Sequence, residues 1–559
     1  MTGPDLLLTG GRDVHQVHFP LGTPPGDVDV LVVGAGPVGL SAAIELRGRG
    51  VDVAVVDKAT GATLVRAGAM GHSPRVVEHF RRWGLLQAIR DEWTFPPEWN
   101  RGIRLVTSLA GHDLGPDPAY RRQGGPSSEE ALRRPQSALQ KVFLTRLAEL
   151  GVPVGGGWEL RALDERADGV EAVLAQVATG ERHLVRARYV IGADGNRSSV
   201  RTLSGIERDG DRATEKRYRL IVRTGDIRDR VGPAPSGVNI VFNERSSGFL
   251  AAVSHRDWRV YAGPYPLDHE PTESELIGTA AASFGFDLDL ELISATVYYD
   301  ASRIAQTFRK GRVLLAGDAA HVRTPGGNLG EGFGDVVNLG WKLAAVLHGS
   351  APDTLLESYD EERRRHNWRV ADHALERSRR SRAVLAELRA EGIPADSDGS
   401  AGALERRERI RARLATETVA APGVTFDERY DQSRAIWYEN DGKERVWAPD
   451  VYEDDPRPGH RAPNGAVDTY GGTLHDRIGA GFSLLSLGDD RSLEASFEDA
   501  ARRRGVPLAV VHLGSVPAGE TYRDAAYFLV RPDQHVAWRG DDLPEGGADA
   551  VLDRVLGAG

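Results

Sequence analysis

A glycine-rich turn between an apolar strand and a helix constrains the fold of this chain more than any other feature. The apolar run at 28–33 predicts a buried strand, the sequence GAGPVG follows it, and the next residues have the apolar spacing of a helix. In such a unit Gly34 makes the tight turn, Gly36 lets a pyrophosphate approach backbone amides at the helix N-terminus, and Gly39 lets the helix lie close to the strand. Asp57, at the end of the next predicted strand, can accept hydrogen bonds from ribose hydroxyls. The sequence therefore predicts a dinucleotide-binding βαβ unit.

Two later segments place an aspartate and a glycine directly after an apolar strand. Asp194 and Gly195 follow the strand YVI, and Gly317 and Asp318 follow VLLA. The second pair leads through the glycine-rich sequence PGGNLGEGFGD into a predicted helix, whose N-terminus can stabilise an anion or a developing negative charge. Either pair alone is also compatible with an ordinary turn or helix cap.

The rest of the chain divides into an interrupted α/β unit and two further parts. Residues 211–300 are strand-like and contain a predicted hairpin, so we expect a sheet domain inserted into the α/β unit. The end of the chain has the order strand–helix–strand–hairpin–helix, the layout of a thioredoxin-like unit. The expected boundaries are an N-terminal arm at 1–26, a dinucleotide-binding domain at 27–210 and 301–391, the sheet domain at 211–300 with part of 93–130, a linker region at 392–455 and the thioredoxin-like domain at 456–559.

In this order the three motifs resemble those of the FAD-dependent aromatic hydroxylases, the class A flavoprotein monooxygenases, and most closely the three-domain branch that acts on phenols and polyketide aromatics. The sequence RPQSALQ at 134–140, the segment Tyr359–Arg363 and the tail VRPDQHVAWRG extend the resemblance over most of the chain. The resemblance implies an α/β fold with a Rossmann-type, glutathione-reductase-like FAD-binding domain, an inserted β-sheet substrate domain and a C-terminal thioredoxin-like domain. The chain has no cysteine, so the last domain has no CxxC for dithiol chemistry and we expect it to serve in packing or dimerisation.

FAD is the cofactor that the resemblance implies. We expect it to be bound noncovalently, since no cysteine is present to form a thioether link. NADPH or NADH is expected as a transient co-substrate, because the chain has a single dinucleotide fingerprint. The residues expected to hold FAD are Gly34, Gly36, Gly39, Asp57, Lys58, Arg66, Arg75, Gln136, Asp194, Gly195, Asp318, Pro325, Gly327 and Gly330.

The implied reaction is hydroxylation of a phenolic or a polycyclic, polyketide-type aromatic. NAD(P)H reduces FAD, O₂ adds at the flavin C4a, and the hydroperoxyflavin passes its distal oxygen to an electron-rich substrate carbon. A nearby base or cation would favour the nucleophilic phenolate, and the candidates are Tyr298, Tyr299, His72 and Arg323. A Baeyer–Villiger oxidation and an oxidative decarboxylation share the fold and stay open as alternatives, as does a catalytically degenerate flavoprotein that acts as a binding or scaffold partner.

Two loops depart from the pattern of that family. The segment Arg66–Ser73 is longer than expected, and the segment from Arg323 to Glu331 is shorter, with Glu331 near the position of a usual Asn. One hypothesis is that these loops face each other across the flavin ring, so that the longer one fills the space that the shorter one leaves. Such compensation would suit a bulky polycyclic ligand, whereas independent drift of the two loops is the alternative.

Composition limits the expected partners. A net charge of −11 argues against a nucleic acid or an anionic membrane surface as the main partner. No apolar run is long enough to span a bilayer and the N-terminus lacks the layout of a signal peptide, so we expect a soluble, cytoplasmic protein. Scattered histidines predict no metal site. The expected partners are a small aromatic substrate and O₂, and the expected state is a monomer or a homodimer.

Overall fold

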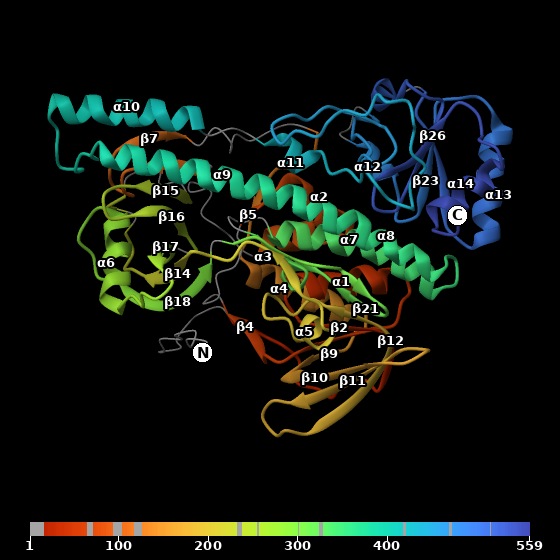
Figure 1. The fold of residues 1–559 in the computed structure, drawn as a ribbon, viewed down its shortest axis with the longest axis horizontal. Helices are drawn as coiled ribbons and strands as arrows, with labels where there is room; N and C mark the ends of the chain where they lie inside the picture. The colour runs from red at the N-terminus through yellow and green to blue at the C-terminus, as the bar shows by residue number, and fades with distance from the viewer. Residues whose placement is uncertain are drawn as a thin grey trace.

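Three units pack together in the molecule (Figure 1). The computed structural model describes residues 16–63, 71–92, 103–116, 126–227, 229–231, 237–253, 256–299, 301–323, 328–417, 421–468, 472–514 and 516–559. The dinucleotide-binding unit contains an eight-stranded sheet, the sheet unit has seven strands, and the C-terminal unit has four. None of the helices formed by these residues is long and apolar enough to cross a membrane.

Parallel strands form the centre of the dinucleotide-binding unit. Strand β2 lies between β12 and β3, β9 and β21 extend the parallel set, and β10 and β11 add an antiparallel edge. The middle of β2 is fully buried, since it packs in one apolar core with helices α1, α4 and α7. The elements are β2 (Asp27–Val33), α1 (Pro37–Gly48), β3 (Val53–Asp57), α4 (Gln136–Glu149), β9 (Val154–Gly156), β10 (Trp158–Glu165), β11 (Val170–Gln176), β12 (Arg182–Gly192), α5 (Ser199–Leu203), β20 (Arg309–Lys310), β21 (Val313–Leu315) and α7 (Asn328–Leu347).

Short elements surround this core. β1 (Gln16–His18) pairs with β4 (Gly61–Thr63), so the described end of the predicted irregular arm is a strand. Val17 and Phe19 explain the difference, because their side chains are buried. The remaining short elements are β5 (Gly71–His72), α2 (Pro74–Arg82), α3 (Leu86–Glu92), β8 (Leu132–Arg133), β13 (Arg208–Gly210), β19 (Arg303–Ala305), the 3₁₀ turn η3 (Gly317–Ala319) and β22 (His321–Val322).

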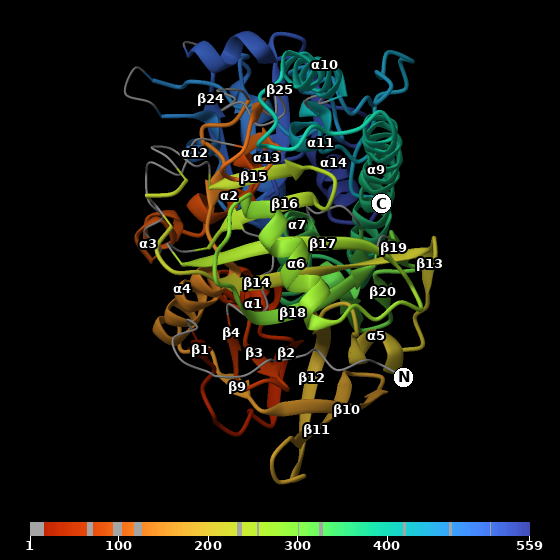
Figure 2. The ribbon, with the colours of Figure 1, turned by 90° about the vertical axis from the view of Figure 1, so that its left-hand side faces the viewer.

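The seven strands of the sheet unit have the order β18-β14-β17-β16-β15-β6-β7. Helix α6 (Glu273–Phe284) covers one face, where Leu220, Val260 and Phe284 belong to one buried apolar cluster. Figures 1 and 2 place α6 on the outside of the molecule, so the opposite, inner face turns toward the dinucleotide-binding unit. The strands are β6 (Ile103–Val106), β7 (Asp113–Pro116), β14 (Glu215–Arg223), β15 (Val238–Phe242), β16 (Ser247–Ala252), β17 (Asp257–Pro266) and β18 (Glu291–Tyr299).

The C-terminal unit has a thioredoxin-like arrangement. Its strand order is β24-β23-β25-β26, in which β23 and β24 are parallel and the other neighbours are antiparallel. The unit shares an apolar cluster with the dinucleotide-binding unit, since Trp341 lies edge-on against Phe482 with ring centroids 5.6 Å apart. Its elements are α12 (Leu474–Arg477), β23 (Phe482–Ser486), α13 (Arg491–Arg504), β24 (Leu508–His512), β25 (Tyr527–Val530), β26 (Val536–Gly540) and α14 (Gly547–Val555).

A long helix runs past all three units in Figure 1. It consists of α8 (Glu357–Tyr359), a π-helical turn η5 (Asp360–Arg364) and α9 (Arg365–Ala390). The region predicted as a linker also contains helices, α10 (Ala401–Glu417) and α11 (Pro422–Phe426). The Gly, Ser and Asp residues before residue 401 obscure the helical periodicity of α10. Within the helix, Ala403, Ile410 and Leu414 recur at helical spacing and are buried, and the last two pack against α9 and the sheet unit.

Candidate functional site

The glycine-rich turn packs on its neighbours through two of its glycines and leaves space at the third. Gly34 has φ +114°, and a Cβ there would lie 2.3 Å from the carbonyl oxygen of Ala193. A Cβ on Gly39 would lie 1.9 Å from the carbonyl oxygen of Gly34. At Gly36, by contrast, a Cβ would meet no atom within 4 Å. The turn is therefore closely packed at Gly34 and Gly39, and it leaves open space at Gly36, beside the N-terminus of α1.

Helix α1 presents its N-terminus to this open space. Gly36 is its N-cap and gives no side-chain hydrogen bond to the first turn, and Pro37 occupies the first helical position. Amide groups of such a first turn, together with the positive end of the helix dipole, favour a phosphate or pyrophosphate.

Two side chains from distant segments hold this turn. Asp57 Oδ2 accepts a hydrogen bond from the amide of Ala35 at 2.7 Å, and Oδ1 accepts one from Ala59 at 2.8 Å. Gln140 Nε2 donates to the carbonyl of Ala35 at 2.9 Å. Because each carboxylate oxygen can accept more than one hydrogen bond, Asp57 keeps capacity for a ribose hydroxyl. Gln136 begins the same helix one turn before Gln140 and shares its face of the helix.

The second motif contacts the first. Asp194 Oδ2 accepts hydrogen bonds from the amides of Ser199 and Val200, and Ser198 caps helix α5. The other oxygen, Oδ1, is buried and has no hydrogen-bond partner in the part of the chain that the structure describes. Burial raises the pKa of Asp194. This carboxyl group therefore has a free acceptor, and its backbone packs against Gly34.

The third motif, Gly317 and Asp318, also lies beside the first turn of α1. Gly317, at φ +61°, begins the turn η3, and a Cβ there would lie 3.1 Å from Val38 in the first turn of α1. The side chain of Asp318 is exposed to solvent. The surrounding protein nevertheless desolvates its carboxyl and thereby raises the pKa of Asp318, although the charges of His321, Arg208 and Arg219 act to lower it. This combination is expected of a carboxylate that lines a ligand site.

Arg208 ties the second motif to the third, and sequence reasoning missed it. Its Nη1 donates to Asn196 Oδ1 at 2.6 Å, and its Nη2 donates to the carbonyl oxygens of Asp318 and Ala319, the latter at 3.1 Å. Burial lowers the pKa of Arg208 to about 10. The three motifs, spread over most of the dinucleotide-binding unit, thus form one connected site around the N-terminus of α1.

These features fit FAD. The open space beside Gly36 and the first turn of α1 match a pyrophosphate, Asp57 matches a ribose, and the exposed Asp318 matches the hydroxyls of a ribityl chain. Among the described residues no group of three His, Asp or Glu side chains is placed to hold a metal ion.

Several predicted residues have other contacts. Arg75, expected at the cofactor, is buried and donates to Gln534 Oε1 of the C-terminal unit at 3.0 Å, with Glu428 Oε2 3.5 Å from its Nε. Arg323 is buried and pairs with Glu331 at 3.2 Å. Both guanidinium groups therefore take part in ion pairs within the protein.

His72 is also buried and has contacts within the protein. Its Nε2 lies 3.0 Å from the carbonyl oxygen of Arg134, and its ring packs edge-on against Phe80. Burial lowers the pKa of His72 to about 4, so the ring is neutral at neutral pH and Nε2 donates to the carbonyl.

The two candidate tyrosines lie on opposite faces of β18, because neighbouring strand residues alternate. Tyr298 is on the inner face, under the guanidinium of Arg219 at 5.4 Å. Tyr299 is about half exposed and lies on the outer face, near Tyr218.

The remaining predictions concern the loops and a lysine. Arg66, Pro325 and Gly327 lie outside the described residues, which leave out 66–70 of the first departing loop and 324–327 of the second. Gly330, at the described end of the second loop, lies against helix α2, which follows the first loop, since a Cβ on Gly330 would lie 3.1 Å from Val76. Lys58 is exposed directly after Asp57.

Acid should destabilise the protein through His72. Its pKa is about 4 in the folded chain and 6.5 ordinarily, so the unfolded chain binds more protons between these pH values and the free energy of unfolding falls as pH drops through that window. Between pH 7 and pH 5 this group should account for a loss of about 2 kcal/mol. Chemical denaturation at both pH values should show a smaller loss for His72→Gln, whose amide can still donate to Arg134. An equal loss in both proteins would contradict this assignment.

The fold and site define a flavin dinucleotide-binding protein whose second domain faces the cofactor site. Comparison with known proteins identifies the family: a model of the FAD binding domain matches residues 27–374, and a model of the aromatic-ring hydroxylase C-terminal domain matches residues 455–559. The chain belongs to the FAD-dependent aromatic-ring hydroxylases; it is a flavoprotein monooxygenase with FAD as its cofactor.

Relatives match over nearly the whole chain. The 4-methyl-5-nitrocatechol 5-monooxygenase of a Burkholderia species is 31% identical over 96% of this chain and 98% of its own. The solved structure of the rebeccamycin biosynthetic enzyme RebC with reduced flavin has a TM-score of 0.83 at 30% identity, covering 96% of this chain and 100% of RebC. Aklavinone-11 hydroxylase in a ternary complex with FAD and aklavinone has a TM-score of 0.78 at 28% identity, with coverage of 96% and 100%.

Proposed function

We propose that this monooxygenase hydroxylates a phenolic or polycyclic, polyketide-type aromatic, with NADPH or NADH as reductant and O₂ as oxygen donor. The observation that carries the proposal is the position of Arg219. It projects from β14 on the inner face of the sheet unit, and its positive charge acts on Asp318 of the third motif. The inner face of the sheet therefore borders the proposed flavin site.

The inner face offers an aromatic surface with cations. The rings of Phe249, Tyr261 and Tyr298 follow one another, with centroids 5.6 Å apart in each step. Arg219 lies over Tyr298 at 5.4 Å, and Arg259 lies over Tyr261 at 5.5 Å. A planar aromatic ligand can pack on such rings, and a cation beside them favours a ligand that carries negative charge.

This arrangement assigns roles to the chain's own residues. Bound FAD would supply the redox chemistry, in which NADPH or NADH is oxidised, one oxygen atom of O₂ enters the substrate and the other is reduced to water. The phenolate form of the substrate is the better carbon nucleophile, and the charge of Arg219 favours it over a phenol of pKa about 10. Tyr298, on the same face, is the candidate that can hydrogen-bond the substrate oxygen, whereas Tyr299 faces away.

Reductant consumption tests the proposed function. Phenols, anthraquinones and angucyclines are added in turn to the purified holoenzyme with NADPH or NADH, and the product mass is measured. We expect at least one aromatic to accelerate NAD(P)H oxidation and to gain one oxygen atom. A flavin that neither nucleotide reduces, with every compound in the panel, would contradict the proposal and favour a scaffold role. A product with oxygen inserted into a ring carbon–carbon bond would indicate a Baeyer–Villiger reaction instead.

Asp318→Ala should weaken FAD binding about tenfold, since a hydrogen bond to a ribityl hydroxyl contributes about 1–3 kcal/mol. Titration of the apoprotein with FAD, followed by flavin fluorescence, measures the Kd. Asp499→Ala removes an exposed carboxylate that accepts a hydrogen bond from Arg502 and serves as the control. An unchanged Kd in Asp318→Ala would rule out the contact.

A further inference from the structure

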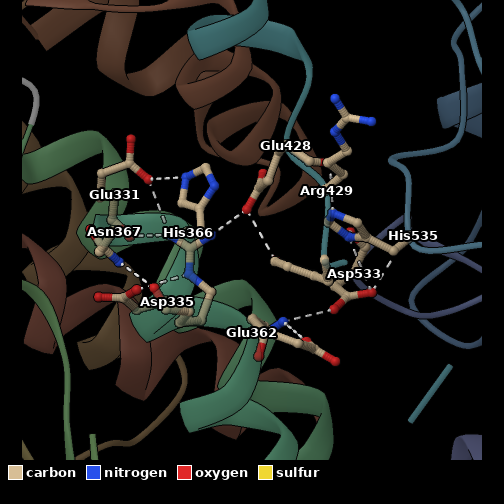
Figure 3. A network of polar contacts seen from close by, with 12 residues as sticks. Glu331, Asp335, Glu362, His366, Asn367, Glu428, Arg429, Asp533 and His535 are labelled. Carbon is tan, nitrogen blue, oxygen red and sulfur yellow. Dashed lines mark hydrogen bonds and ion pairs between the residues drawn. The ribbon is translucent and has the colours of Figure 1, made fainter. Parts of the chain in front are cut away.

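We propose that the C-terminal unit is part of the flavin site, and that Glu428, Arg363 and Asp335 are positioning residues that hold the turn carrying Asp318. Figure 3 shows Glu428 and Asp335 in one network of polar contacts. Arg363 donates to both carboxylates, and Asp335 accepts a hydrogen bond from Gly317 of η3, so a continuous run of buried ion pairs leads from Glu428 to η3. The inference rests on FAD binding, not on the identity of the substrate.

Asp335 holds the turn directly. This residue of α7 has no exposed surface, and its Oδ2 accepts hydrogen bonds from the amide of Gly317 at 3.0 Å and from His321 Nε2 at 2.7 Å. Gly317 and His321 flank Asp318 on either side. Although burial opposes ionisation, His321 and Arg363 keep the pKa of Asp335 below its usual value. The carboxylate therefore fixes both ends of the segment that presents Asp318.

Arg363 occupies the other oxygen of Asp335 and joins it to two further groups. Its Nε donates to Asp335 Oδ1 at 2.9 Å, its Nη2 donates to Glu331 Oε2 at 3.1 Å, and its Nη1 donates to Glu428 Oε1. A Cβ on Gly334 would lie 2.7 Å from Nη2, so the guanidinium lies flat against α7. A planar fork with three carboxylate partners has little freedom to turn, so the position of each partner affects the others.

The π-helical turn η5 explains why this arginine points inward. Two consecutive charged residues, Glu362 and Arg363, are both buried there. Glu362 faces Arg531 of the C-terminal unit while Arg363 faces Asp335. Such single-turn π segments are frequent at functional sites.

Glu428 is held from the C-terminal side. It lies in the strap, residues 427–438, which runs along that unit. The carbonyl of Glu428 accepts hydrogen bonds from the amide of Arg461 and from His535 Nε2, both at 3.2 Å. Its Oε1 also accepts a hydrogen bond from Tyr430 at 3.1 Å, and the ring of Tyr430 stacks on His535 at 4.2 Å. The position of the Glu428 carboxylate is thus set by residues of the C-terminal unit.

The negative charge of Glu428 helps to neutralise the buried guanidinium of Arg363. Despite burial, Arg363 and Arg75 hold the pKa of Glu428 well below its usual range, so the side chain is ionised at neutral pH. When this negative charge is removed, Arg363 keeps its own charge and must be neutralised by Glu331 and Asp335 alone. A shift of the guanidinium toward these partners would displace Asp335 from Gly317 and His321.

The test measures FAD affinity and local exchange in matched variants of the full-length protein. Glu428→Gln removes the charge and keeps the shape. Glu439→Gln is the control, since Glu439 closely follows the strap and accepts a two-point contact from Arg539 at 2.7 and 2.9 Å on the protein surface. FAD titration of the apoprotein gives the Kd, and hydrogen–deuterium exchange of the apoprotein reports on residues 317–322.

We expect Glu428→Gln to raise the Kd for FAD at least tenfold and to accelerate exchange in 317–322, with both values within twofold of the parent in the control. Asp335→Asn should weaken binding similarly, and the double variant should be no worse than the stronger single one, because Glu428 reaches the turn only through Arg363 and Asp335. A folded Glu428→Gln protein whose Kd lies within twofold of the parent overturns the proposal, even if its thermal stability falls. If Glu428→Gln does not fold, Tyr430→Phe decides: a roughly threefold weaker Kd supports the proposal and an unchanged Kd overturns it.

Discussion

Gly36→Val should abolish FAD binding while leaving the protein folded. The added side chain would enter open space in the protein alone, since no atom lies within 4 Å of the Cβ position. We propose that in the holoenzyme the pyrophosphate of FAD approaches the first turn of α1 through this same space. The backbone at Gly36, with φ −71° and ψ 170°, is one that valine adopts readily. We expect a Kd for FAD more than a hundredfold higher and a colourless purified protein.

The matched control is Gly39→Ala, which adds a smaller group three residues later. Its Cβ would lie 1.9 Å from the carbonyl oxygen of Gly34, so the helix cannot keep its place on the turn. This variant should lose thermal stability as well as FAD, whereas Gly36→Val should lose FAD alone. A yellow Gly36→Val protein with a normal Kd would contradict the proposed position of the pyrophosphate.

Arg531→Leu should lower the free energy of unfolding by about 3–5 kcal/mol, the usual effect of removing one partner from a buried ion pair. Arg531 is fully buried and donates to both oxygens of Glu362, at 2.7 and 2.8 Å, and to Asp533. Leucine fills part of the volume but leaves the two carboxylates with less neutralising charge. Lys342, 2.7 Å from Glu362, compensates only in part.

Denaturant unfolding of the apoprotein measures this loss. Arg503→Leu is the control, because its partner Asp549 is exposed and such surface pairs contribute about 0–1 kcal/mol. Similar losses in the two variants would show that the contact between the units does not depend on the buried network.

The sequence predicts those parts of the site in which the backbone geometry requires a particular residue. Gly34 and Gly39 are required by close approaches that no side chain allows, so their spacing is visible in any chain with this turn. Strand periodicity and the motif order likewise predict the α/β class and the thioredoxin-like C-terminal unit, both of which the structure confirms.

The part that could not be predicted depends on which charged residues are buried. Arg75, Arg363 and Arg531 resemble many other arginines in this chain, and their partners lie far away in the sequence. The family resemblance predicts Arg75 at the flavin, and its contacts with Glu428 and with Gln534 of the C-terminal unit are not visible in that resemblance. The one local signal for the buried network is a pair of adjacent charges, Glu362 and Arg363, inside a matched family motif, and the π-helical turn that buries both cannot be predicted from periodicity.

Oxygen labelling tests the central claim, aromatic monooxygenation by this FAD protein, most directly. The holoenzyme is incubated under ¹⁸O₂ with NADPH or NADH and the aromatic panel, and the products are analysed by mass spectrometry. We predict a product that keeps the carbon skeleton of its substrate and carries one ¹⁸O atom as a new ring hydroxyl. Products without ¹⁸O, from every aromatic whose addition accelerates NAD(P)H oxidation, would contradict the account.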